Sequence, residues 1–111
     1  MLTLIGNTIY ITKGDTLDLQ VAIQNQDGEE YTPSENDRIR FAMKKKYTDL
    51  EPMIVKEISP DTLRLRIEAE ETKRWKTSPT PYVYDIEITF EDGTVDTFIE
   101  RQKLYVTEEV Y

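Results

Sequence analysis

The sequence predicts an all-β protein in which short antiparallel strands pack as a two-layer sandwich. Strand-like segments recur about every ten residues with turn residues between them, the spacing of a sandwich or a small barrel. In residues 82–90, apolar and polar side chains alternate, which marks a strand with one buried and one exposed face. The Asp92-Gly93 pair that follows is typical of a hairpin turn. Helical signals are nearly absent.

The same alternation predicts the other elements in chain order. Residues 16–24 carry the clearest pattern after residues 82–90. Residues 53–58 have no wholly apolar face, so we expect this strand to lie at a sheet edge. One helical segment is expected over residues 69–76, because these residues are rich in Glu and Lys and precede two prolines. Further strands are expected over residues 8–12, 30–32, 38–44, 62–68, 94–99 and 103–107.

The inward faces of these strands define the predicted hydrophobic core of a single domain, residues 1–111. A chain of this length has room for one core, and it buries enough surface to fold without a metal or a disulfide. The expected core residues are Leu17, Leu19, Val21, Ile23, Ile39, Phe41, Leu63, Leu65, Ile67, Tyr84, Ile86 and Ile88.

Seven or eight short strands with one short helical crossover favour an immunoglobulin-like antiparallel β-sandwich, with a small barrel as the alternative. Such sandwiches place a tyrosine at the start of the strand that follows the crossover, two residues before a core position. Tyr82 is expected to be this corner tyrosine, and Tyr84 to occupy the core position.

Composition limits the chemistry available to the protein. Its 22 acidic and 14 basic residues give a net charge of −8, which disfavours nucleic acid because phosphate binding needs a basic surface. The chain has no cysteine and no histidine, so thiol nucleophiles, disulfides, the usual zinc sites and histidine-based catalysis are excluded. We expect no export signal, membrane span or cofactor.

Acidic residues are plentiful, but their positions indicate turns rather than a reactive site. Asp15, Asp27, Asp37, Asp61 and Asp92 lie at predicted turns, where their side chains accept hydrogen bonds from backbone N–H groups. No Asp-x-Asp-x-Asp-Gly loop for calcium and no marked carboxylate pair for glycoside hydrolysis is present. The sequence therefore predicts a protein that is not an enzyme and has no metal site.

Surface aromatic and edge-strand residues are the candidate binding residues. An interface with other proteins is expected at Met53, Val55, Tyr105 and Tyr111. An alternative function is a carbohydrate-binding or adhesion module that uses Tyr47 and Trp75 as an aromatic platform. Trp75 is also interpreted as a plug over one end of the sandwich.

Charged residues on the outer faces are expected to pair across strands and hold the register. The predicted partners are four arginines and two acidic residues of the 82–90 strand: Arg38, Arg40, Arg64, Arg66, Asp85 and Glu87.

Several segments, taken in order, resemble small phage and prophage structural proteins of Gram-positive bacteria. The relevant proteins are the N-terminal immunoglobulin-like domain of upper-baseplate proteins and its stand-alone relatives. Lys13-Gly14-Asp15-Thr16 opens a strand, and Tyr82-Val83-Tyr84-Asp85-Ile86-Glu87-Ile88 follows the crossover. One departure is the segment 77–81, Thr-Ser-Pro-Thr-Pro, where relatives have a short glycine turn. The other matching segments are residues 37–45, 52–56, 71–72, 92–99 and 104–110.

This resemblance implies a non-enzymatic virion component or assembly adaptor of the tail or baseplate type. Such a protein is made in the host cytoplasm and ends in the virion. Its partners are other virion or tail proteins, or further copies of itself, and it binds neither nucleic acid nor membrane.

Overall fold

The computed structural model describes residues 2–5, 7–24, 29–77 and 80–108, and this part of the chain is mostly β-structure. The all-β prediction is confirmed. The described elements are β1 (Leu2–Ile5), β2 (Thr8–Thr12), β3 (Leu17–Gln20), β4 (Arg38–Lys44), β5 (Ile54–Ile58), β6 (Arg64–Ile67), α1 (Ala69–Thr72), β7 (Tyr82–Thr89) and β8 (Val95–Thr107).

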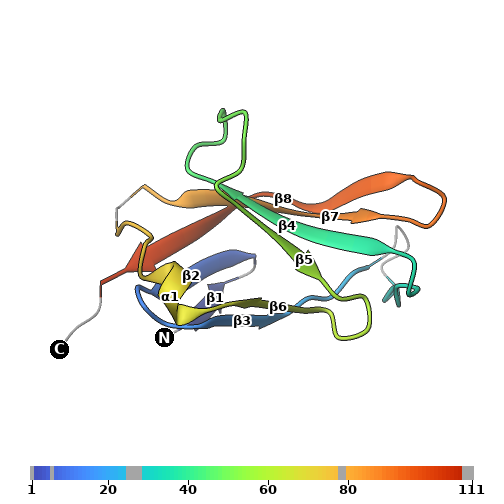
Figure 1. Ribbon diagram of the computed structural model, residues 1–111, viewed down its shortest axis with the longest axis horizontal. Helices are drawn as coiled ribbons and strands as arrows, with labels where there is room; N and C mark the ends of the chain where they lie inside the picture. The colour runs from blue at the N-terminus through green and yellow to red at the C-terminus, as the bar shows by residue number, and fades with distance from the viewer. Residues whose placement is uncertain (1, 6, 25–28, 78–79, 109–111) are drawn as a thin grey trace.

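The strands form two sheets (Figure 1). One sheet has six strands in the order β1-β2-β8-β7-β4-β5, and the other consists of β3 and β6. Most pairs are antiparallel, but β2 and β8 run parallel. The expectation of a wholly antiparallel arrangement is therefore wrong at this pair. Alternation along a strand indicates which face is buried, but it carries no information about the direction of the neighbouring strand.

Side chains from both sheets form one hydrophobic core. The predicted core residues are buried, apart from Leu19 and Leu63, which are half-buried and pack against the core. Leu63 has a φ of 52°, an uncommon conformation for a residue with a Cβ atom, and it lies immediately before β6. The core also takes in Ile9 and Ile11 from β2, and Leu104 and Val106 from β8.

The Asp92-Gly93 hairpin joins β7 to β8, as expected. The backbone N–H of Phe90 donates to the carbonyl of Thr94 at 2.8 Å, and the N–H of Gly93 donates to the carbonyl of Phe90 at 2.8 Å. Gly93 has a φ of 92°. These features form a three-residue loop in which a turn ends in a left-handed glycine.

Several element boundaries differ from the predictions. Strand β3 ends at Gln20, although the N–H of Val21 still donates to the carbonyl of Leu63 at 2.7 Å. The expected strand over residues 30–32 is reduced to an isolated bridge between Gln24 and Glu30. The two strands expected near the C-terminus are one strand, β8, and Arg101 within it has a φ of 53°.

The helical crossover was predicted over residues 69–76, but α1 covers only the four residues Ala69–Thr72. Its continuation is a turn, in which the N–H of Trp75 donates to the carbonyl of Thr72 at 3.1 Å. Among the described residues, no helix is long and apolar enough to span a bilayer.

Candidate functional site

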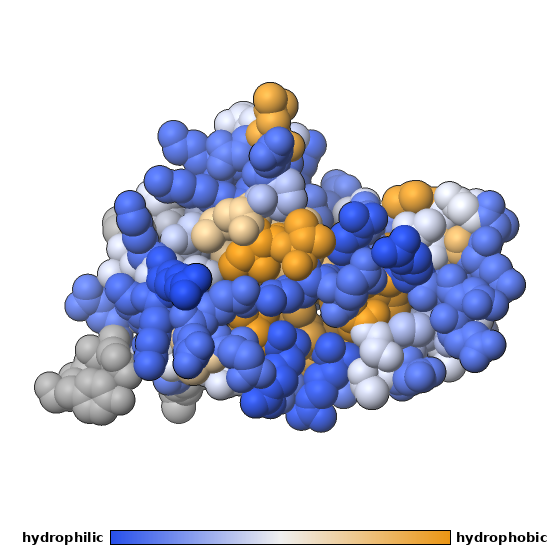
Figure 2. Space-filling model, viewed as in Figure 1, coloured by the Kyte–Doolittle hydropathy of each residue, from blue (hydrophilic) through white to orange (hydrophobic). Residues whose placement is uncertain are grey.

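The loop between β4 and β5 presents apolar side chains to solvent. Leu50 is 97% exposed, Tyr47 51% and Met53 45%, and Val55 on the adjoining strand β5 is 47% exposed. This loop projects from the sheet at the top of Figure 1, and Figure 2 shows hydrophobic surface at the end of the projection. Grouped exposed apolar residues mark interaction sites more often than scattered ones do. We call Tyr47, Leu50, Met53 and Val55 the loop patch.

Contacts at the base of the loop hold it in place. The N–H of Lys46 donates to Oδ2 of Asp49 at 3.0 Å, and the N–H of Met53 donates to the carbonyl of Met43 at 2.8 Å. The guanidinium of Arg101, on β8, lies 4.3 Å from the centroid of the Tyr47 ring, within the range of a cation–π interaction. The loop patch is therefore held by β4, through Met43, and by β8, through Arg101.

The predicted edge position of residues 53–58 is confirmed, because β5 is the terminal strand of the larger sheet. Val55 and Glu57 are exposed, whereas Lys56 is half-buried and its Nζ lies 3.0 Å from Oε1 of Glu71. A charged side chain that points inward discourages unspecific pairing at a sheet edge. The edge of β5 therefore offers the side chains of the loop patch to a partner more readily than its backbone.

Tyr105 is not part of this patch, and the segment of β8 around it is not an open edge. Residues 104–107 of β8 lie between β2 and β7. The half-buried ring of Tyr105 stacks on Tyr10, with 5.1 Å between centroids and 8° between planes. Residues 104–107 therefore offer no free strand edge to a partner. Tyr111 lies outside the described residues.

The aromatic platform expected from Tyr47 and Trp75 does not form. Trp75 is 2% exposed, and its ring lies 6.4 Å from that of Tyr82 within the core. Its alternative interpretation as a buried plug agrees with this position. A sugar-stacking surface needs exposed ring faces, and the stacked pair Tyr10 and Tyr105 turns one face of each ring toward the other.

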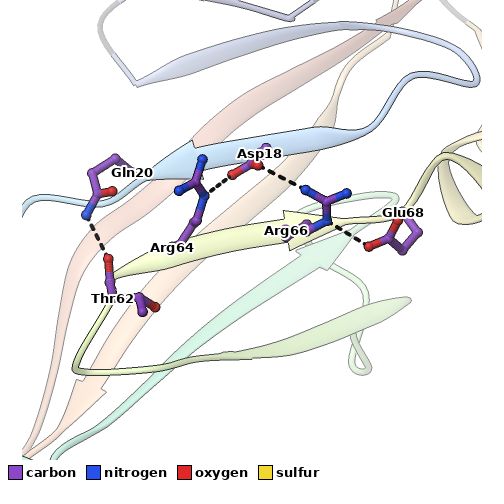
Figure 3. Close-up of polar contacts among 6 residues, drawn as sticks. All are labelled: Asp18, Gln20, Thr62, Arg64, Arg66 and Glu68. Carbon is purple, nitrogen blue, oxygen red and sulfur yellow. Dashed lines mark hydrogen bonds and ion pairs between the residues drawn. The ribbon is translucent and has the colours of Figure 1, made fainter.

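The outer face of the small sheet carries a network of ion pairs (Figure 3). Asp18 lies between Arg64, at 2.6 Å, and Arg66, at 3.2 Å, and Arg66 also pairs with Glu68 at 2.8 Å. The hydrogen bond from Arg64 lowers the pKa of Asp18, and the hydrogen bond to Asp18 raises the pKa of Arg64. These charges are satisfied by one another, so this face is polar and internally neutralised.

The arginines of the larger sheet follow the predicted pairing in part. Arg40 and Glu87 lie opposite each other on β4 and β7, 3.2 Å apart, as expected. Arg38 instead pairs with Glu57 on β5 at 3.0 Å. Asp85 accepts a hydrogen bond of 2.6 Å from the backbone N–H of Arg101. The predicted cross-strand role of charge is therefore right, but three of the four arginines have partners other than Asp85 and Glu87.

One carboxylate, that of Asp37, is buried among the described residues. It accepts hydrogen bonds from the backbone N–H groups of Ser34, at 3.0 Å, and Glu91, at 3.2 Å, and from the hydroxyl of Tyr31. The bond from Tyr31 contributes most to lowering its pKa. Through these hydrogen bonds the Asp37 carboxylate joins two loops. Its pKa is lowered, whereas a general acid needs a raised pKa.

Sequence reasoning missed Leu50 and the projection of its loop. A single leucine in a polar loop gives no periodic signal, and its near-complete exposure is known only from the fold. In the part of the chain that the structure describes, no cluster of three or more His, Cys, Asp or Glu residues is placed to hold a metal ion. No family model matches the chain, and no curated protein matches it.

Proposed function

We propose that this protein is a non-enzymatic virion structural or assembly protein of a phage or prophage, of the tail or baseplate type. It acts through contacts with other virion proteins. The observation that carries a contact role is the loop patch, because Leu50 exposes 97% of its surface on a loop anchored at its base. The phage assignment rests on the ordered sequence resemblance over nearly the whole chain.

We further propose that the fold is an immunoglobulin-like sandwich. Two packed sheets connected by the short element α1 support this assignment. The hydroxyl of Tyr82 also accepts a hydrogen bond of 2.9 Å from the backbone N–H of Lys76. This is the kind of upstream backbone contact made by a corner tyrosine. Tyr84, two residues later, is buried as the core position requires.

The virion assignment is tested on purified particles. Particles from an induced culture of the encoding organism are purified on a density gradient, and their proteins are identified by mass spectrometry. We expect the chain in the particle fraction at a fixed ratio to the tail proteins. Recovery of the chain only in the soluble fraction would contradict the assignment.

The loop patch is tested by the double variant Leu50→Ser with Met53→Ser, with Asp61→Ser as the matched control in another exposed turn. Both variants should melt at the wild-type temperature, because all three side chains are exposed. We expect the double variant to be depleted from particles and the control to be incorporated normally. Equal incorporation of the two variants would exclude the loop patch as the contact.

A further inference from the structure

A groove lined mostly by apolar residues runs between the two sheets on the side where β3 faces the first half of β8. It consists of three adjoining hollows of about 260, 440 and 600 Å³. The first two share Asn7, Ala22 and Ile99, and the last two share Gln24. The groove therefore follows the chain from β3 to Gln24 on one wall and from Ile99 back to Val95 on the other.

The β8 wall of the groove is a strand edge. Within the described residues, β2 pairs with β8 only from Leu104 to Thr107, so residues 95–100 have a strand neighbour, β7, on one side. Hydrogen-bonded and non-bonded pairs alternate in an antiparallel ladder. Phe90 and Thr94 form a hydrogen-bonded pair, so Asp96 also pairs by hydrogen bonds and Thr97, opposite Glu87, does not. The N–H and C=O of Thr97 therefore point away from β7. Such groups are a template for an added strand.

The charge around the groove selects the kind of strand that fits. Asp96 is the one charged side chain among the described residues that line the three hollows. Glu30, whose backbone is bridged to that of Gln24, adds a second acidic residue beside the Gln24 wall. The nearby guanidinium of Arg101 is placed over the ring of Tyr47. A strand with basic flanks is attracted to these two acidic residues, whereas a second copy of this chain, with a net charge of −8, is repelled.

We propose that the groove binds an extended segment of a partner protein as an added β-strand. The segment has apolar side chains at alternate positions and Lys or Arg residues at its ends. Backbone hydrogen bonds to Thr97 hold the strand, the hollows receive its apolar side chains, and Asp96 and Glu30 attract its basic flanks. This inference rests on the contact role proposed above and adds the chemistry of one partner.

The full-length protein is titrated by calorimetry with a synthetic peptide in which Val and Thr alternate between two pairs of lysines. A second peptide carries glutamate pairs instead. We expect the lysine peptide to bind about tenfold more tightly than the glutamate peptide. Asp96→Lys should reduce this preference to about threefold or less, and Asp61→Lys, in an exposed turn that does not line the hollows, should preserve it.

The strand geometry is tested at Thr97, where Thr97→Pro removes the outward N–H and Thr97→Ala keeps it. Proline is tolerated at an edge position whose N–H faces outward, and thermal melts of both variants verify folding. We expect the lysine peptide to bind Thr97→Pro about fivefold more weakly than Thr97→Ala. If Thr97→Pro unfolds, amide shifts of residues 94–100 in the peptide-bound wild type provide the same test.

Equal binding of the two peptides, equal binding to the two Thr97 variants, or no binding at all would overturn the proposal. Self-association of the wild type that is abolished by Thr97→Pro would assign the groove to a second copy instead. A chain that is present in particles but binds neither peptide refutes the groove proposal alone. A chain that binds the lysine peptide as expected but is absent from particles refutes the virion assignment alone.

Discussion

The hydroxyl of Tyr31 donates a hydrogen bond of 2.6 Å to Oδ2 of Asp37, six residues further along the chain. The ring of Tyr31 also packs edge-on against Phe90, with 5.7 Å between centroids. Asp37 in turn receives the N–H of Glu91, in the loop between β7 and β8. The pair therefore links the segment before β4 to the β7–β8 hairpin through one buried carboxylate.

Replacing Asp37 with alanine should destabilise the protein by about 3 kcal/mol, because three donors lose a charged acceptor. Tyr31→Phe removes one of these bonds and should cost about 1–2 kcal/mol. Urea unfolding of the two single variants and the double variant measures the coupling between them. Additive effects of the two substitutions would show that the observed bond does not contribute to stability.

Stability should fall as the pH is lowered through the acidic range. Hydrogen bonds from Tyr31 and Arg64 lower the folded-state pKa values of Asp37 and Asp18, respectively, so the ionised forms favour folding. The resulting stabilisation is complete above the unfolded-state pKa of about 3.9 and is lost as the pH falls through the lower folded-state values. Urea midpoints measured between about pH 6 and pH 2 test this dependence. Asp37→Asn should flatten the curve, and an unchanged slope would contradict the assignment.

Ile86→Ala should cost about 2–5 kcal/mol, because Ile86 is 3% exposed within the core and its truncation leaves a cavity. Val95→Ala is the control, since Val95 is 56% exposed and its truncation should change stability by less than about 0.5 kcal/mol. Chemical denaturation of both variants gives the two values. Equal effects would mean that the assignment of the buried face of β7 is wrong.

Calcium and chelators should leave the melting temperature unchanged. No group of three or more carboxylates in the described residues is arranged to hold a metal ion. A ligand that binds only the folded state raises its stability by mass action. Thermal melts in millimolar calcium and in EDTA test this expectation, and a clear upward shift in calcium would reveal a binding site.

Alternation correctly predicted the buried faces of β4 and β7. Their apolar residues at every second position are buried in the structure: Ile39, Phe41, Ile86 and Ile88. The same signal contains no information on neighbours further along the chain, so the parallel pairing of β2 and β8 was not predictable. It also treated Tyr105 as exposed, although stacking on Tyr10 covers part of its ring.

The candidate sites depend on features without a local sequence signal. The edge position of β5 was predictable because Lys56 interrupts its apolar face. The exposure of Leu50 and the groove beside Thr97 arise from how the loop and the two sheets are placed in space. Trp75 is buried, although the sequence was compatible with either burial or exposure. An aromatic residue near a turn gives no local signal that distinguishes the two.

The parallel pairing of β2 with β8 has a consequence for the order of folding. Ile9 lies beside Leu104, so the larger sheet becomes continuous only when segments about 95 residues apart meet. During synthesis, β1 and β2 leave the ribosome well before residues 104–107, so β2 lacks its β8 neighbour until the end of the described chain has been made. Long-range closure of this kind slows folding to the range of milliseconds to seconds. Chaperones are therefore expected to meet the hairpin of β1 and β2 without its β8 neighbour.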